Sequence, residues 1–115
     1  DLKQKIQKIG QVNFLAEKID LDAAGMKDLA FELGGEVENL FLILGAENEG
    51  KALLTLYISK DLAAEKNWNA GNMVRELGKS IQGGGGGQAF FATAGGKNPA
   101  GIHEALEKAK SYLSE

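Results

Sequence analysis

The residues best suited to chemistry lie around a run of five glycines, Gly83–Gly87, in the second half of the chain. Two adjacent aromatic residues, Phe90 and Phe91, follow the run, and Gly95 and Gly96 come shortly after them. A backbone without Cβ atoms can approach a ligand or another chain very closely, and successive N–H groups can form a nest for an anion. An exposed aromatic ring beside such a nest can stack on a nucleobase. We therefore interpret this segment as a binding loop, with a flexible surface loop as the alternative.

Common catalytic and nucleotide-binding motifs do not fit these residues. A phosphate-binding P-loop requires lysine and then serine or threonine after its glycines, but Gln88 and Ala89 stand there. Gly84, Gly86 and Ala89 match the dinucleotide-binding spacing, but they follow a predicted helix instead of a strand. His103 is the only histidine, and no pattern of metal ligands, or of nucleophile and acid, surrounds it. We therefore expect neither a catalytic residue nor a metal site in this chain.

The two aromatic residues allow two interpretations. In an extended segment, Phe90 and Phe91 point to opposite faces, so one would enter the core and the other would be exposed. The alternative is that both are buried. An exposed ring would be the stacking platform, and the nearby cations available for phosphate contacts are Arg75, Lys79 and Lys97.

Hydrophobic periodicity predicts the elements that must position this segment. The predicted helices span residues 2–9, 22–33, 69–81 and 98–113, with a short helical turn at 59–64. The predicted strands span residues 12–16, 40–44 and 52–58. The last two strands are joined by a short polar turn, which is typical of a hairpin at the centre of a sheet. We predict an α/β (α+β) fold in which helices pack on a mixed sheet of three to five strands.

Local signals mark the ends of several of these helices. Asp20 or Asp22 is the expected N-cap of the second helix and Asn69 that of the third, because a short polar side chain accepts the free N–H groups of a first turn. The last helix is expected to begin at Asn98, with Pro99 at its first position. Gly10 is expected to end the first helix.

Length and composition restrict the class of protein. A chain of 115 residues with 43% hydrophobic and 25% charged residues is typical of one globular domain. No apolar run approaches the roughly 20 residues that span a bilayer, and the absence of cysteine fits a cytoplasmic protein. The chain begins at Asp1 without a methionine, so we expect a piece of a longer protein or a processed chain.

The charge is small and unevenly distributed. The net charge of −3 argues against a basic module that holds nucleic acid by charge alone. Residues 1–59 carry a net charge of −4, whereas residues 60–110 carry +2, so the glycine-rich half is the more basic one.

Residues 59–98 carry a family resemblance. The segment Ser59–Leu62, an amphipathic helix, the glycine run and Ala92–Gly96 together resemble the C-terminal domain of alanyl-tRNA synthetases, a family associated with DHH phosphoesterases. In those domains a glycine run is followed by Arg-Pro-Asp-x-Ala-Gln-Ala-Gly-Gly. The resemblance covers roughly residues 36–113. It implies that residues 1–10 are the end of a helical connector and that 11–115 form a single globular domain.

The departures from the family pattern also carry information. Gln88 replaces the usual arginine, which removes a permanent cation suited to phosphate. Gln88 also replaces the histidine that the phosphoesterase relatives carry after their glycines, and their Asp-His-His metal domain is absent here. We therefore expect this chain alone to be non-catalytic.

The resemblance implies a function in tethering. It implies that the domain binds the elbow of alanine-specific tRNA and links aminoacylation to editing by other domains of the same synthetase, in the cytoplasm and away from membranes. No cofactor is expected here, because ATP and Mg²⁺ would serve the parent enzyme's other domains. The candidate RNA-binding residues are Gly83, Gly84, Gly85, Gly86, Gly87, Gln88, Phe90, Phe91, Gly95, Gly96, Lys97, Lys79 and Arg75. The alternative is a protein-interaction module, for example one that forms a homodimer, with a structural glycine loop.

Overall fold

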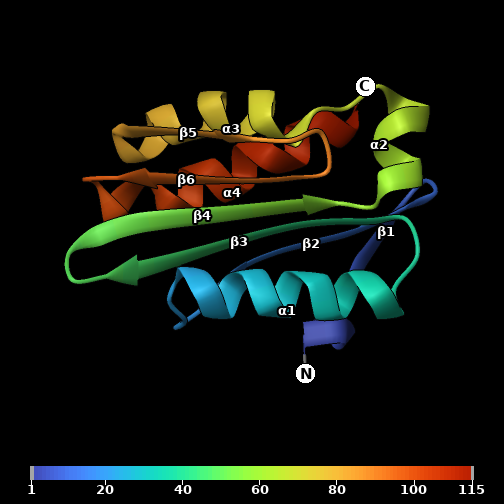
Figure 1. Cartoon of the computed structure of the whole chain (residues 1–115), viewed down its shortest axis with the longest axis horizontal. Coiled ribbons are helices and arrows are strands. Elements are labelled where there is room, and N and C mark those ends of the chain that lie inside the picture. Colours follow the sequence, from blue (N-terminus) through green and yellow to red (C-terminus); the bar gives the residue numbers. More distant parts are fainter. Residues whose placement is uncertain (1, 115) are drawn as a thin grey trace.

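The structure, a computed structural model, describes residues 2–114 and contains one six-stranded mixed sheet with helices on both faces (Figure 1). The strand order is β1-β2-β3-β4-β6-β5. The strands are β1 (Gln7–Ile9), β2 (Val12–Lys18), β3 (Leu40–Asn48), β4 (Lys51–Ile58), β5 (Gly83–Gly87) and β6 (Phe91–Gly96). The α-helices are α1 (Ala23–Glu36), α2 (Lys60–Lys66), α3 (Ala70–Leu77) and α4 (Ile102–Ser111). The predicted fold class is confirmed.

The centre of the sheet is the hairpin of β3 and β4, as the apolar runs predict. The two strands pair antiparallel, with Phe41 opposite Ile58. On β3, Phe41 and Ile43 belong to the core beneath α3 and α4, whereas Leu42 and Leu44 belong to the core beneath α1. A strand buried on both faces is continuously apolar instead of alternating, which explains the sequence of this segment.

The helices leave part of one sheet face uncovered. The helix α1 packs on β3 and β4, whereas α3 packs on β5 and β6 from the other side. In Figure 1, β5 and β6 lie in front of α3 and α4, and no helix within residues 2–114 lies in front of them. Along β6, Ala92 and Ala94 are buried on the helix side, while Thr93 and Gly95 are exposed. We call this uncovered side of β6 and β5 the open face.

Two of the predicted helix caps are confirmed. The Oδ1 atom of Asp22 accepts a hydrogen bond from the Gly25 N–H at 2.8 Å, and Oδ1 of Asn69 accepts one from the Asn72 N–H at 3.0 Å. Asn98 holds the predicted N-cap position, with Pro99 directly after it, but the turn that begins there is a 3₁₀ turn and no side-chain cap forms. This turn, Pro99–Gly101, precedes α4.

Residues 2–9 differ from the predicted helix. Residues Leu2–Lys5 form one 3₁₀ turn, and β1 then pairs antiparallel with β2. Gly10 has a φ of 62°, so it forms the turn of this hairpin instead of ending a helix. The short helical pattern was outweighed by backbone pairing along the edge of β2. The assignment of residues 1–10 to a connector stays a prediction.

The glycine run also differs from its prediction. It forms the edge strand β5 instead of a loop, and together with β1 it raises the sheet to six strands. Glycine is unfavourable in strands because it has no side chain to pack, so sequence patterns give no strand signal for it. The helix α1 is longer than predicted as well, since it continues through Gly34 and Gly35 to Glu36.

Candidate nucleic-acid interface

Within residues 2–114, the strand β5 pairs with one other strand only, and its outer edge lies beside α3. It forms an antiparallel ladder with β6, in which Gly83 lies opposite Gly96 and Gly87 opposite Ala92. The Gln88 N–H donates to the Phe91 carbonyl oxygen at 2.8 Å. Because antiparallel pairs alternate between bonded and non-bonded, the N–H and C=O groups of Gly83, Gly85 and Gly87 point away from β6.

Glycine is required in β5 by close packing. A Cβ atom on Gly83, Gly85 or Gly87 would collide with a carbonyl oxygen of β6. On the helix side, a Cβ on Gly71 of α3 would lie 2.7 Å from the Gly87 oxygen, which is too close for a real contact. A Cβ on Gly78, one residue beyond α3, would lie 3.2 Å from the Gly84 Cα. Glycines at 83, 85 and 87 therefore permit the close pairing with β6, and Gly71 and Gly78 let α3 and the turn after it lie directly against β5.

Four aromatic residues form a cluster at the end of the open face near α1. One comes from each of α1, β4 and β6, and the fourth lies just before β6. We call Phe31, Tyr57, Phe90 and Phe91 the aromatic patch. The ring centroids of Phe31 and Phe91 are 5.1 Å apart, and those of Phe31 and Tyr57 are 5.4 Å apart in an edge-to-face arrangement. The side chain of Phe31 is 42% exposed, and the other three residues are half-buried. Apolar groups gathered at a surface in this way are candidates for a contact site.

The two predictions for the phenylalanine pair are both wrong. Both side chains are half-buried, and Phe91 packs against the core beneath α1 without being buried in it. The reason is that α1 stops short of β6, so the Phe91 ring on the open face is covered only in part, by Phe31. Phe90 precedes β6, and its carbonyl oxygen accepts the Ile58 N–H at 2.9 Å, which fixes the backbone beneath the patch.

Two lysines lie over the patch. The Nζ atom of Lys60, at the start of α2, is 4.6 Å from the centroid of the Phe90 ring. The Nζ atom of Lys27, on α1, is 5.9 Å from the centroid of the Phe91 ring. Both distances are within the range of cation–π attraction, which holds the ammonium groups beside the rings. The patch therefore combines stacking surface with positive charge.

Sequence reasoning missed Phe31, Tyr57, Lys27 and Lys60. Phe31 carried a usable signal, because it falls outside the apolar stripe of its helix and is therefore aimed away from the core beneath α1. The two lysines carried no signal of this kind, because exposed lysines on helices are common.

Two hollows adjoin the patch. The first has a volume of about 400 Å³ and the second one of about 610 Å³. The first is lined by Lys27, Phe31, Gly86, Gly87, Gln88, Phe90, Phe91, Ala92 and Thr93. The second is lined by Phe31, Gly34, Val37, Glu38, Asn39, Tyr57, Ser59, Lys60, Asp61 and Phe90. Phe31 and Phe90 line both hollows and therefore stand between them.

The structure divides the predicted site residues into groups. Gly86, Gly87, Gln88, Phe90 and Phe91 come together around the first hollow. The other predicted residues do not line it. They are Gly83, Gly84, Gly85, Gly95, Gly96, Lys97, Lys79 and Arg75.

Of the predicted cations, Lys97 and Lys79 lie away from the patch, whereas Arg75 lies beside Gly86 of the first hollow. Lys97 follows β6, and its N–H donates to the Gln82 oxygen at 3.4 Å. This bond places Lys97 at the Gly83 end of β5, which is about 13 Å along the strand from Gly87. Lys79 lies in the 3₁₀ turn Gly78–Ile81 just before β5. Arg75 lies beside the strand, since a Cβ on Gly86 would be 3.7 Å from its Nη2 atom.

A polar link ties the last helix to α3 behind the glycine strand. The Tyr112 hydroxyl donates a hydrogen bond to the Glu76 carboxylate, and the Lys108 ammonium lies 3.9 Å from the other Glu76 oxygen. The hydrogen bond from Tyr112 and then the charge of Lys108 lower the pKa of Glu76. Burial, and then the bond to Glu76, raise the pKa of Tyr112 well above its usual value. This link supports α3 and therefore the packing beneath β5.

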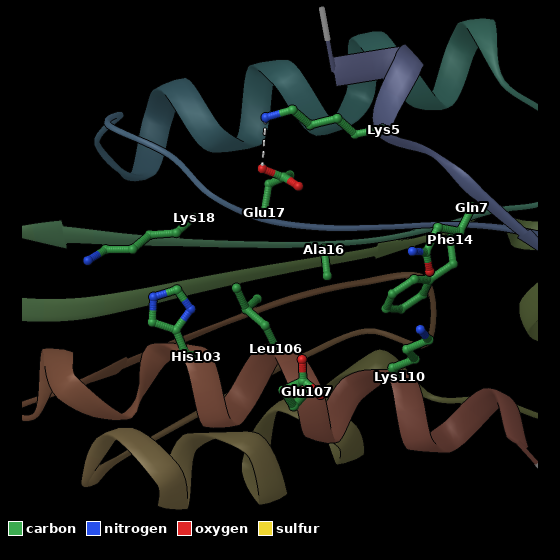
Figure 2. A pocket seen from close by; sticks show the side chains of 10 residues that line it. All are labelled: Lys5, Gln7, Phe14, Ala16, Glu17, Lys18, His103, Leu106, Glu107 and Lys110. Atoms are coloured by element: carbon green, nitrogen blue, oxygen red, sulfur yellow. Dashed lines mark hydrogen bonds and ion pairs between the residues drawn. The ribbon is translucent and has the colours of Figure 1, made fainter.

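A further cleft, of about 440 Å³, lies between β2 and α4. Figure 2 shows Lys18 beside His103 at one end and Lys110 near Phe14 at the other. Glu107 points toward the cleft between them, and Lys5 above it forms an ion pair with Glu17 at 3.3 Å. Its charges are mixed in sign, and its aromatic ring, Phe14, is buried, so the cleft offers no stacking surface.

Two further structural facts concern residues 2–114. No helix in this range is long and apolar enough to cross a membrane. No group of three or more histidine, cysteine, aspartate or glutamate side chains in the same range comes together as a metal site would require.

Comparison with known proteins establishes the class of this fold and motif. The family model described as the DHHA1 domain matches residues 11–115, and the chain belongs to this family. The crystal structure of the C-Ala domain from Aquifex aeolicus alanyl-tRNA synthetase superposes with a TM-score of 0.86 at 27% sequence identity, over 96% of this chain and 99% of that one. The resemblance to the C-terminal domain of alanyl-tRNA synthetases is therefore confirmed.

Sequence relatives support the same assignment. The alanine–tRNA ligase of Christiangramia forsetii is 64% identical over 112 residues, which are 97% of this chain and 13% of the relative. The alanine–tRNA ligase of Cytophaga hutchinsonii is 42% identical over 113 residues, with the same two coverages. The chain thus spans about an eighth of the length of the curated relatives it matches.

Proposed function

We propose that this chain is the tRNA-binding C-terminal domain of an alanine–tRNA ligase and that it docks on the elbow of alanine-specific tRNA. The observation that carries the proposal is the aromatic patch with its two lysines, next to a bare glycine strand on the open face. By holding the elbow, the domain would keep one tRNA within reach of the aminoacylation and editing domains of the same cytoplasmic enzyme. The relatives named alanine–tRNA ligase support this assignment.

The physical character of the patch fits an RNA loop region better than a regular duplex. Side chains cannot read the deep major groove of A-form RNA, whereas exposed bases in loops stack on aromatic rings. Each stacked base contributes about 1–3 kcal/mol. The net charge of −3 and the two lysines at the patch limit the number of phosphate contacts. Binding is therefore expected to depend more on stacking than on charge.

The chemistry of aminoacylation is assigned elsewhere in this proposal. The chain supplies docking only, and no residue of it is proposed to act on alanine or ATP. ATP and Mg²⁺ would bind in other domains of the ligase.

The direct test is a titration of this chain with alanine-specific tRNA at about 50 and 200 mM salt, combined with nucleotide footprinting. We expect protection of the elbow at both salt concentrations. Because few phosphates are involved, the affinity should fall by less than the factor of about 10³ that is typical of proteins with many phosphate contacts. The absence of elbow protection at the lower salt would contradict the proposal.

A second candidate function is dimerisation, supported by the position of β5 as the last strand of the sheet. The outward-pointing carbonyl oxygens of Gly83 and Gly87 face Gly78 and Gly71, so pairing with the same strand of a second copy would use the stretch around Gly85. A Cβ atom on Gly83, Gly85 or Gly87 would collide with β6, so these glycines have the structural role that this alternative assigns to them. Sedimentation analysis of this chain between micromolar and millimolar concentration distinguishes the two candidates, since a dimer through β5 predicts a concentration-dependent mass.

A further inference from the structure

We propose that the aromatic patch holds two RNA bases that are not stacked on each other, one in each hollow, with Phe31 and Phe90 as the wall between them. The inference rests on the proposed function and specifies what the patch binds. The nearest alternative is a single base lying across the patch.

The placement of the wall carries the argument. Phe31 and Phe90 line both hollows, so an object that enters either hollow meets at least one of these rings. Both hollows have volumes within the range of about 300–1,000 Å³ in which small ligands bind. A flat aromatic base on each side of the wall would therefore be separated from its neighbour by a side-chain ring.

The rings of the aromatic patch differ in how accessible they are for stacking on a base. The centroid of the Phe91 ring lies 5.1 Å from that of Phe31 and 5.9 Å from the Lys27 Nζ atom. The Phe91 ring therefore serves mainly as the floor of the first hollow. Phe31 is 42% exposed and contacts Tyr57 through an edge-to-face arrangement. Phe31 is therefore the ring that the packing around it leaves most accessible for stacking.

The positive charges follow the same division. Lys27 lines the first hollow only, and Lys60 lines the second only. A nucleotide carries one phosphate for each base, so one lysine beside each hollow suits two successive nucleotides. This one-to-one arrangement would be unnecessary for a single base.

The polar side chains of the two hollows differ. Gln88 and Thr93 in the first can both donate and accept hydrogen bonds. The second hollow contains Asn39 and Ser59 together with two carboxyl side chains, Glu38 and Asp61, which are rich in acceptor oxygens. We therefore expect the second hollow to prefer a base that presents amino or imino hydrogens.

The test is an NMR titration of this chain with CMP, GMP and the dinucleotide CpG bearing a 5′-phosphate, which carries one phosphate for each base. We expect CpG to shift the amide signals of Thr93 and of Asn39 together, and to bind at least about ten-fold more tightly than either mononucleotide. Replacing Phe31 by alanine should remove this gain. Shifts confined to one hollow, equal affinities for CpG and the mononucleotides, or an unaffected Phe31→Ala variant would overturn the two-base inference.

Matched variants locate each base. Gln88→Ala should weaken CpG binding through the first hollow. Asn39→Gly should do so through the second hollow, and glycine suits this position because its φ is 51°. Gln11→Ala is the control, since Gln11 is an exposed glutamine that lies outside both hollows. Loss of the ten-fold gain in both Gln88→Ala and Asn39→Gly, but not in the control, supports two occupied hollows.

The same variants separate this inference from the proposed function. If tRNA binding depends on Phe31 while CpG occupies one hollow only, the two-base inference fails and the elbow-docking proposal stands. If the unmodified chain gives no elbow protection on tRNA while CpG fills both hollows, elbow docking fails and the two-base site stands.

Discussion

The two sides of the β6–β5 pair serve different purposes although they share the same residues. On the helix side, Ala92 and Ala94 are buried in the core, and a methyl group on Gly83, Gly85 or Gly87 would collide with the backbone of β6. On the open face, the same strands expose bare backbone and Thr93, and the aromatic patch stands at one end. The contrast shows that a glycine run can be rigidly required by packing on one side and remain available for contact on the other.

The largest expected effect tests the packed side. We expect Gly85→Ala to destabilise the fold by about 3 kcal/mol, because its Cβ would collide with the Thr93 oxygen and β5 would have to move. Gly84→Ala is the matched control. A Cβ at Gly84 meets nothing within 4 Å, so the change in stability should be under about 1 kcal/mol. Urea unfolding measures both, and equal losses in the two variants would contradict the packing argument.

The next effect tests the open face. We expect Phe31→Ala to weaken tRNA binding by about 1–3 kcal/mol while the fold is retained, because a partly exposed stacking ring is lost. Leu21→Ala is the control, since Leu21 is also 38% exposed but lies just before the N-terminal end of α1, away from the patch. Filter binding with circular dichroism on the same samples separates affinity from folding. Equal affinities of the two variants would mean that the open face does not contact RNA through this ring.

The charge on the open face should contribute less. Replacing Lys27 and Lys60 together by glutamine should reduce the slope of log affinity against log salt by about 1–2, in proportion to the phosphates they contact. Lys51→Gln removes one positive charge at the other end of β4 and should leave the slope unchanged. An unchanged slope in the double variant would show that the lysines position the rings without touching phosphate.

The smallest expected effect concerns the hydrogen bond from Tyr112 to Glu76, which supports α3 on the packed side. Because the folded pKa of Tyr112 is raised, its contribution to stability is fully present below the unfolded pKa of about 10 and is lost as the pH rises further. We expect the urea midpoint to fall above pH 10, and this part of the fall to be absent in Tyr112→Phe. A Tyr112→Phe variant that retains the full pH dependence would assign it to other groups.

The lowered pKa of Glu76 acts at the opposite end of the pH scale. The bond from Tyr112 and the charge of Lys108 stabilise the carboxylate, so their contribution is present above the unfolded pKa and is lost as the pH falls through the folded value. Glu76→Gln should therefore flatten the acid side of the stability profile slightly, because the carboxylate is exposed to solvent. This profile is measured by the same urea titrations.

The sequence predicted those parts of the molecule in which local chemistry and burial agree. The β3–β4 hairpin is buried on both faces, so its apolar runs were unambiguous. The caps at Asp22 and Asn69 depend on neighbouring backbone alone, and both were found. The strands β1 and β5 were missed, because one is short and edge-paired and the other has no side chains that could reveal a period.

The candidate interface was predicted only in part for a related reason. Gln88, Phe90 and Phe91 lie within four residues of one another, so adjacency in the sequence brought them together. Phe31 and Lys60 reach the same place only because α1 and α2 flank the end of β4, and that proximity is a property of the tertiary fold. Lys97 and Lys79 are near the glycines in sequence, but the extended strand places them at its far end.

The pairing pattern of the sheet has a consequence for the order of folding. The sheet consists of three local hairpins, β1–β2, β3–β4 and β5–β6, and local contacts form fastest. The β5–β6 hairpin has the highest cost in chain entropy, because glycine has the most freedom to lose. We therefore expect it to dock last, after β4 and α3 are in place. The surface assigned to RNA would then be complete only when the rest of the chain has folded, so a nascent or partly unfolded chain would not capture tRNA prematurely.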